Sequence, residues 1–303
     1  MYGLVNGKIY TLKGSDWEKH PASAMAVSDD GKIMKVGSDE EIKVLLAENS
    51  PNPEIRNLEG NTVFPGFVDS HTHAPGTAFT ELFQINLYGA FDRETTMARI
   101  QDFVENHPDE TAYFGSGFNS GIVIENPEER PALWIDEICN DKPVILTSYD
   151  CHAKWLNSCA MSRLGIGKNT QTAGQGVISK TSAGELRGLF NDVPDIGIPD
   201  QQYTKEQNLE ALKHYVKKMN KWGYTALLSQ APHFGLDARA YSDMDAAGEL
   251  TVRATIASEL AQDSFEADLT RLNKLRSEIK SDKLKVATAK FFVDGVLEGH
   301  KAY

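Results

Sequence analysis

The first sixty residues of the chain alternate apolar and polar positions with a period of two, as short β-strands do. The alternating runs are LVNGKIYTL and SAMAVSDDGKIMKVGS, and Asp30-Gly31 in the second run predicts a β-hairpin turn. The stretch EEIKVLLAENS predicts a short helix, which Pro51 and Pro53 would end. Residues 1–61 are therefore expected to form a small antiparallel module ahead of the main domain.

From residue 63 onward, apolar strands alternate with amphipathic helices, which is typical of a parallel α/β sheet or barrel. Four strands are predicted, at residues 63–70, 224–230, 252–259 and 284–293. Thr204 and Gln207 form a capping box at the start of a helix, whose apolar stripe is Leu209, Leu212, Val216 and Met219. A second helix is predicted at about 264–280 from apolar residues at helical spacing.

The segment between the first two of these strands is too long for a crossover within a barrel. It contains strands and helices of its own, including YFGSGFN and PVILTSYD. Barrels carry their substrate-handling loops at one mouth. Residues 75–203 are therefore predicted to be an inserted subdomain that covers this mouth.

Charge and hydropathy narrow the class of partner. The chain has 303 residues and a formal net charge of -12, which disfavours nucleic acid, because nucleic-acid affinity depends on clustered Lys and Arg. Small-molecule substrates are expected instead. The sequence has neither an apolar signal region nor a run of about 18 apolar residues, so we expect a cytoplasmic protein that does not bind membranes.

The main chemical signal is the stretch VFPGFVDSHTHAPG, in which His71 and His73 end an apolar strand. Residues i and i+2 of a strand project from the same face, so the two imidazoles point together, and Asp69 points with them. Two neutral imidazoles can share one metal ion. Taken alone, the pair is also compatible with surface histidines or with histidines satisfied in the core.

Several motifs resemble the amidohydrolase superfamily, in the branch that includes N-substituted formamide deformylase. They are NTVFPGFVDSHTH, DCHAKWLNSCAMSRLGI, GELRGLF, WGYTALLSQ and AKFFVDGVLEGHKAY, and the resemblance extends over the whole chain. It implies an α/β fold in which a (β/α)₈ metal-dependent hydrolase barrel is attached to a β-sandwich. Residues 1–61 would then be part of the sandwich and 62–303 part of the barrel. It also implies that His71 and His73 bind the catalytic metal.

The resemblance suggests further site residues. Lys290 in AKFFVDG falls on the fourth predicted strand, where many relatives carry a carboxylated lysine that bridges two metal ions; a lysine that reaches the barrel rim is the other interpretation. Asp150 and His152 in YDCHAKW are expected beside the substrate, although a structural role is equally compatible with the residues. Asp294, in a strand-to-loop junction, would orient substrate or cap the turn. The loop histidines His233 and His300 are weaker candidates.

The family pattern also requires histidines on strands 5 and 6 and a catalytic aspartate on strand 8, and this sequence has no strand after KVATAKFFVDG to carry them. We therefore expect an incomplete barrel of strands 1 to 4, from a truncated or split enzyme that a complementing C-terminal chain or an oligomer would complete. The implied activity is hydrolysis of non-peptide amide or formamide-like C–N bonds by a metal-activated water, with one or two ions.

Zinc suits imidazole ligands, and iron or manganese would also fit. A non-catalytic remnant or binding module that keeps the pocket is the rival hypothesis. A lactonase or a deaminase on the same barrel is a third.

Overall fold

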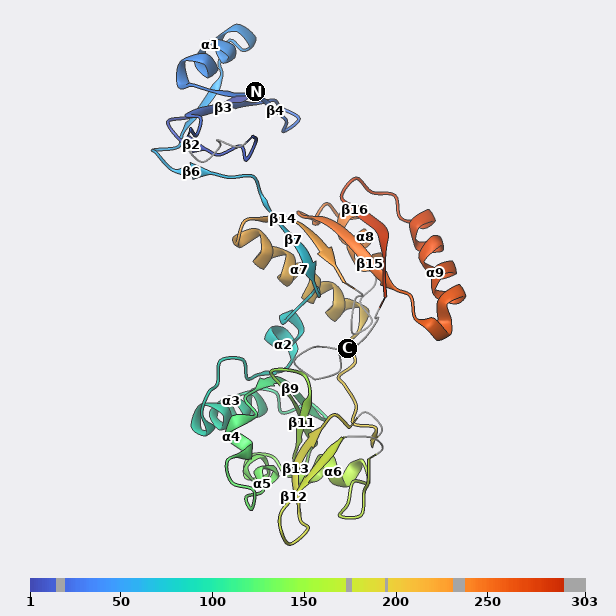
Figure 1. Ribbon diagram of the computed structural model, residues 1–303. Coiled ribbons are helices and arrows are strands. Elements are labelled where there is room, and N and C mark those ends of the chain that lie inside the picture. The colour runs from blue at the N-terminus through green and yellow to red at the C-terminus, as the bar shows by residue number, and fades with distance from the viewer. Residues whose placement is uncertain (15–19, 173–175, 194–195, 231–237, 292–303) are drawn as a thin grey trace. The chain divides into compact units, whose positions relative to one another are not determined.

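The computed structural model in Figure 1 describes residues 1–14, 20–172, 176–193, 196–230 and 238–291. The described chain divides into two units. One contains residues 1–68 together with 223–226, and the other contains the remainder. None of the helices in the described ranges combines the length and the apolar composition that crossing a bilayer requires.

The first unit is built on a four-stranded sheet with the order β4-β3-β1-β5. Its elements are β1 (Tyr2–Val5), β2 (Lys8–Ile9), β3 (Ala24–Val27), β4 (Ile33–Gly37), α1 (Asp39–Asn49), β5 (Glu54–Asn57) and β6 (Thr62–Val63). Both faces of β3 are buried: Ala24 and Ala26 pack with Ile42 and Leu46 of α1, and Met25 and Val27 pack in a second cluster. The hairpin predicted at Asp30-Gly31 is present between β3 and β4.

The expectation of a purely antiparallel module is wrong in one respect. Strand β1 pairs antiparallel with β3 but parallel with β5, and the short β2 and β6 are also parallel. The chain passes through α1 before it forms β5, and such a crossover lets a later strand enter a sheet in the parallel direction. The helix was predicted from the sequence, but its effect on strand direction was not.

A six-stranded sheet lies in the second unit, with the order β12-β13-β11-β10-β9-β8. Strands β8, β9 and β10 are parallel, whereas β11, β12 and β13 pair antiparallel. The elements of this region are α2 (Ala78–Phe83), β8 (Ile85–Asn86), α3 (Arg93–Asn106), β9 (Tyr113–Phe118), α4 (Gly121–Ile124), α5 (Pro131–Asp136), β10 (Val144–Ser148), β11 (Ala153–Leu156), α6 (Ser158–Arg163), β12 (Val177–Lys180) and β13 (Leu186–Asn191).

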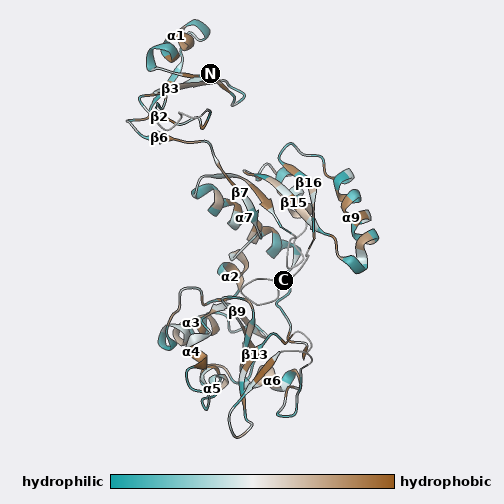
Figure 2. Ribbon diagram, viewed as in Figure 1, coloured by the Kyte–Doolittle hydropathy of each residue, from teal (hydrophilic) through white to brown (hydrophobic). Residues whose placement is uncertain are grey.

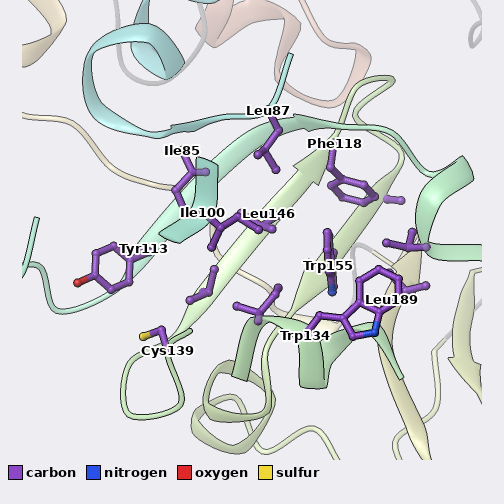
Figure 3. Packing of buried hydrophobic residues seen from close by; sticks show 14 residues of the cluster. Ile85, Leu87, Ile100, Tyr113, Phe118, Trp134, Cys139, Leu146, Trp155 and Leu189 are labelled. Atoms are coloured by element: carbon purple, nitrogen blue, oxygen red, sulfur yellow. The ribbon is translucent and has the colours of Figure 1, made fainter. Parts of the chain in front are cut away.

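Both faces of this sheet are buried, because consecutive residues of its strands belong to two different apolar clusters. Val144 and Leu146 of β10 pack in one cluster with Trp155, and Ile145 packs in the other with Leu156. Figure 3 shows the first cluster, in which Trp155 lies between Phe118 and Trp134. Near-continuous apolar strands are what a sheet covered on both sides requires.

A second four-stranded sheet has the order β16-β15-β14-β7. Its elements are β7 (Phe67–Thr72), α7 (Lys205–Lys221), β14 (Tyr224–Ser229), α8 (Ala238–Ala246), β15 (Arg253–Glu259), α9 (Phe265–Glu278) and β16 (Leu284–Lys290). Strands β15 and β16 are parallel. Helix α7 begins at the predicted capping box of Thr204 and Gln207. In Figure 2 apolar and polar residues alternate along α9, as in an amphipathic helix.

The strand predicted at 63–70 is divided into two pieces. Thr62 and Val63 form β6, which pairs with β2, and β7 begins only at Phe67. Pro65 has no N–H to give to a ladder. A Cβ on Gly66 would lie 2.2 Å from the side chain of Thr225, so this position needs glycine. The break shifts β7 toward the C-terminus, and the strand therefore includes His71.

Candidate functional site

His71 and His73 lie at the C-terminal end of β7 and are exposed. The neighbouring Thr72 points the other way, because its hydroxyl lies 2.8 Å from that of Tyr215 on α7. Residues alternate between the faces of a strand, so His71 projects from the face of β7 opposite α7. The carboxylate of Asp69 accepts a hydrogen bond from the backbone N–H of His71, at 3.1 Å.

The spacing of the two rings suits a shared ligand. The ring centres of His71 and His73 are 5.6 Å apart, with 57° between the planes. Two imidazoles whose nitrogens lie about 2.1 Å from one ion have ring centres about 5 Å apart. Both side chains are neutral nitrogen donors when unprotonated, the ligand type that zinc and other transition metals accept. The donor set therefore fits half of a tetrahedral site.

Lys290 is the last residue of β16, and a β-bulge sets the direction of its side chain. Val286 is paired with Ile256, but Thr288 is paired with Ala257, so Ala287 is an extra residue on β16. If residues alternated regularly along β16, Lys290 would project from the same face as the buried Leu284. The bulge reverses this alternation, because one inserted residue shifts the strand by half a period.

After the bulge, Lys290 is paired with Glu259. Ser258, the neighbour of Glu259 in β15, is buried, and Glu259 itself is exposed. Paired residues of adjacent parallel strands project from the same face. Lys290 therefore shares the exposed face of Glu259.

Within the described ranges, no group of three or more His, Cys, Asp or Glu side chains is arranged to hold a metal ion. In the sheet, β7 and β16 are the two outer strands, with β14 and β15 between them. The structure thus brings His71 and His73 together and places Lys290 at the opposite edge of the same sheet.

Asp150 and His152 lie in the tight turn between β10 and β11. One oxygen of the Asp150 carboxylate accepts hydrogen bonds from the Ser148 hydroxyl and from the backbone N–H of His152. Burial would raise the pKa of Asp150, but these hydrogen bonds and the nearby charge of His152 hold it below its usual value. Cys151 between them has a φ of 65°, an uncommon conformation for a residue with a side chain.

The imidazole of His152 has a partner that the sequence did not indicate. Its Nδ1 lies 2.8 Å from a carboxylate oxygen of Asp192, just after β13, and the backbone N–H of Asp192 donates to the carbonyl of His152. These residues are distant in sequence and are brought together by the pairing of β11 with β13. Such a carboxylate fixes the orientation and tautomer of a histidine ring. Asp192 is therefore a residue that sequence analysis missed.

Burial raises the pKa of the Cys151 thiol, and the negative charge of Asp150 acts in the same direction. A thiol with a raised pKa is a poor nucleophile at neutral pH. The predicted site residue Asp294 and the loop residues His233 and His300 lie outside the described residues.

Residues 54–303 match the sequence pattern of the amidohydrolase family. The chain is 26% identical over 302 residues to the exoenzymes regulatory protein AepA of Pectobacterium carotovorum, covering 97% of this chain and 63% of that protein. It is 28% identical over 196 residues to the N-substituted formamide deformylase of Arthrobacter pascens, covering 62% of this chain and 33% of the enzyme. The chain thus spans less than two thirds of the length of these relatives.

An uncharacterized metal-dependent hydrolase from Pyrococcus horikoshii has a solved structure with a similar fold. The TM-score is 0.66 at 22% sequence identity, and the match covers 98% of this chain and 56% of that chain. This likeness shows that the α/β fold is shared. The sequence match over residues 54–303, most of the chain, establishes that the chain belongs to the amidohydrolase family.

Proposed function

We propose that this chain provides part of the active site of a metal-dependent hydrolase that cleaves non-peptide C–N bonds, such as those of amides or formamides. The observation that carries the proposal is the pair of exposed imidazoles, His71 and His73, with ring centres 5.6 Å apart at the end of a strand in an amidohydrolase-family chain. Likeness to a metal-dependent hydrolase from Pyrococcus supports the metal, and likeness to the Arthrobacter formamide deformylase supports the bond type.

In this proposal the four-stranded sheet is part of a (β/α)₈ barrel, in which β7, β14, β15 and β16 are strands 1 to 4. Residues 1–61 are part of a β-sandwich, and 75–203 are an inserted substrate-handling subdomain. The remaining strands, with further metal ligands and the proton-transferring aspartate, come from a longer form of the protein or from a complementing chain. Curling of the sheet in a closed barrel would bring its outer strands closer to one site.

The residues present have distinct proposed roles. His71 and His73 bind a divalent ion, most simply zinc, through neutral nitrogens, while Asp69 holds the backbone of His71. Lys290, in carboxylated form, supplies an oxygen ligand from the same face of the sheet, and Asp150, His152 and Asp294 contact the substrate. When bound, the ion supplies a water of lowered pKa and polarises the scissile carbonyl.

Metal content of the purified chain tests the proposal. Elemental analysis after dialysis should find close to one bound zinc or other divalent ion per chain in the wild type, and less than a tenth of that in a His71→Ala, His73→Ala variant. A His20→Ala, His107→Ala variant removes two other imidazoles and should keep the metal. Equal metal in the wild type and in the His71→Ala, His73→Ala variant would contradict the proposal, and a folded wild type without metal would mean that the two imidazoles do not hold an ion without the remaining ligands.

A further inference from the structure

A pocket lies at the carboxyl ends of the three parallel strands of the six-stranded sheet. Gly89, Ala90 and Phe91 follow β8, Asn119 and Ser120 follow β9, and Tyr149 and Asp150 follow β10; together with Gly117 and Phe118 they line a cavity of about 320 Å³. Adjacent parallel strands direct their following loops to one edge of the sheet, and open α/β sheets bind ligands at this edge. The volume suits a small organic molecule.

A β-bulge lies in the wall of this pocket. In the ladder between β9 and β10, Thr147 is paired with Ser116 and Ser148 with Phe118, so Gly117 is an extra residue, a β-bulge. Its φ is 95°, and a Cβ there would lie 2.6 Å from the ring of Tyr88. Only glycine fits this conformation and this contact. Bulges often occur beside binding sites because they redirect the residues that follow.

The lining combines aromatic surface with one negative charge. The side chains of Phe91 and Tyr149 are 77% and 71% exposed, far more than large apolar rings usually are. Asp150 is the one charged residue among the described lining residues. Its Oδ1 accepts from Ser148 and His152, which fixes the carboxylate, while its Oδ2 receives no hydrogen bond within the described part of the chain.

We propose that this pocket binds the cationic group of a small organic molecule, an ammonium or guanidinium on an apolar body, with Asp150 as counter-ion and Phe91 and Tyr149 as its walls. A fixed carboxylate with one unused oxygen favours a cationic donor over a neutral one. Aromatic faces attract cations and apolar groups alike and do not attract anions. Of the proposed function, this inference uses only the assignment of Asp150 to ligand binding, and the metal site takes no part in it.

Three ligands of similar shape test the charge preference: benzylamine, benzyl alcohol and benzoate. Binding to the full chain is measured by NMR chemical-shift titration, in the presence of a chelator so that the histidine pair cannot contribute. We expect benzylamine to bind at least fivefold more tightly than benzyl alcohol, and benzoate not to bind. Equal affinities for the amine and the alcohol, or no binding of the amine, would overturn the inference and leave the metal proposal untouched.

An Asp150→Asn variant isolates the charge, because asparagine keeps an oxygen that can accept from Ser148 and from the backbone of His152. The preference for benzylamine over benzyl alcohol should fall below twofold in this variant. Glu125→Gln removes one charge from the same region outside the pocket lining and should leave the preference unchanged. A fivefold preference that survives Asp150→Asn in a folded protein would show that another group binds the amine.

Discussion

The six-stranded sheet and the four-stranded sheet β16-β15-β14-β7 differ in how far their faces are buried. In the six-stranded sheet, consecutive residues of β10 and β11 enter two apolar clusters, so both faces are covered. In the four-stranded sheet β16-β15-β14-β7, β7 has no fully buried residue, and β16 buries Leu284 and Val286 while Lys285 between them is exposed. The six-stranded sheet is covered on both faces, whereas the four-stranded sheet leaves residues of one face exposed.

The candidate site residues also occupy different positions in the two sheets. In the six-stranded sheet the candidate site residues Asp150 and His152 lie in the turn between β10 and β11, whereas Arg187 within β13 is buried and donates hydrogen bonds to backbone carbonyls. The four-stranded sheet instead carries two candidate ligands within its strands: His71, on the face of β7 opposite α7, and the partly exposed Lys290 at the end of β16. Polar side chains within a strand are tolerated when that face is not packed against apolar neighbours.

The largest expected effect on the free energy of unfolding is at a buried residue of the six-stranded sheet. Trp155 is fully buried between Phe118 and Trp134, and Trp155→Ala should lower the free energy of unfolding by about 3–5 kcal/mol, since it removes a large buried side chain and leaves a cavity. Phe67 of β7 is 53% exposed, and Phe67→Ala should cost less than about 1.5 kcal/mol. Urea unfolding followed by circular dichroism measures both.

A matched control for the first variant is Trp155→Phe, which keeps an aromatic ring. The indole N–H of Trp155 has no hydrogen-bond partner in the described structure, so phenylalanine also removes an unsatisfied polar group, and its cost should be clearly smaller than that of alanine. Similar losses for Trp155→Ala and Phe67→Ala would mean that the two sheets do not differ in burial as described.

An intermediate effect is expected at the contact between α2 and α7. The Glu81 carboxylate pairs with Lys218 and, at 2.7 Å, with Nε2 of His214, and accepts from the Thr77 hydroxyl. Burial alone would raise the pKa of Glu81, but these partners lower it from 4.5 to about 2. A depressed pKa means that the ionised carboxylate stabilises the fold above pH 4.5, and this contribution is lost as the pH falls through about 2.

The variant Glu81→Gln should therefore be less stable than the wild type at pH 7 by roughly 1–2 kcal/mol, after allowance for the partial exposure of the group. The difference should narrow below pH 4.5 and approach zero near pH 2. Glu210→Gln on the exposed side of α7 is the control and should change stability little at any pH. A gap between wild type and Glu81→Gln that stays constant from pH 7 to pH 3 would show that the charge of Glu81 does not stabilise this contact.

Local signals in the sequence predicted much of this structure. Asp30-Gly31 marked a hairpin, and Thr204 with Gln207 marked the start of α7, because turns and helix caps depend on a few adjacent residues. The break at Pro65-Gly66 was visible in the sequence, yet the strand was predicted to continue through it. The pairing of β1 with β5 was missed because it depends on the path of the chain through α1.

The candidate sites show the same limit. The i, i+2 spacing was sufficient to place His71 and His73 together, because it is a property of a single strand. The direction of Lys290 depends on a bulge at Ala287, which no alternation of residue types reveals. The contact of His152 with Asp192 needs two strands to be paired first. The sequence pattern therefore indicated the chemistry of the side chains but could not predict which distant strands are paired.

The smallest expected effect on stability is at the accessible face itself. His71 and His73 are exposed and Lys290 is partly exposed, so replacing any one of them with alanine should change the free energy of unfolding of the metal-free chain by no more than about 0.5 kcal/mol. Urea unfolding in the presence of a chelator measures this. A loss of more than about 1.5 kcal/mol at His71 or His73 would mean that these residues maintain the fold rather than bind a ligand.

The same variants then separate a metal site from a merely exposed surface. A ligand that binds only the folded state at a concentration one hundred times its Kd stabilises the fold by about 2.7 kcal/mol. Zinc added after removal of the chelator should therefore raise the unfolding free energy of the wild type and of the His20→Ala, His107→Ala control, and should not raise that of His71→Ala, His73→Ala. If zinc stabilises all three proteins equally, it binds elsewhere. If replacing a residue leaves the stability of the metal-free fold unchanged but abolishes the stabilisation by metal, that residue acts as a metal ligand and not as a packing residue.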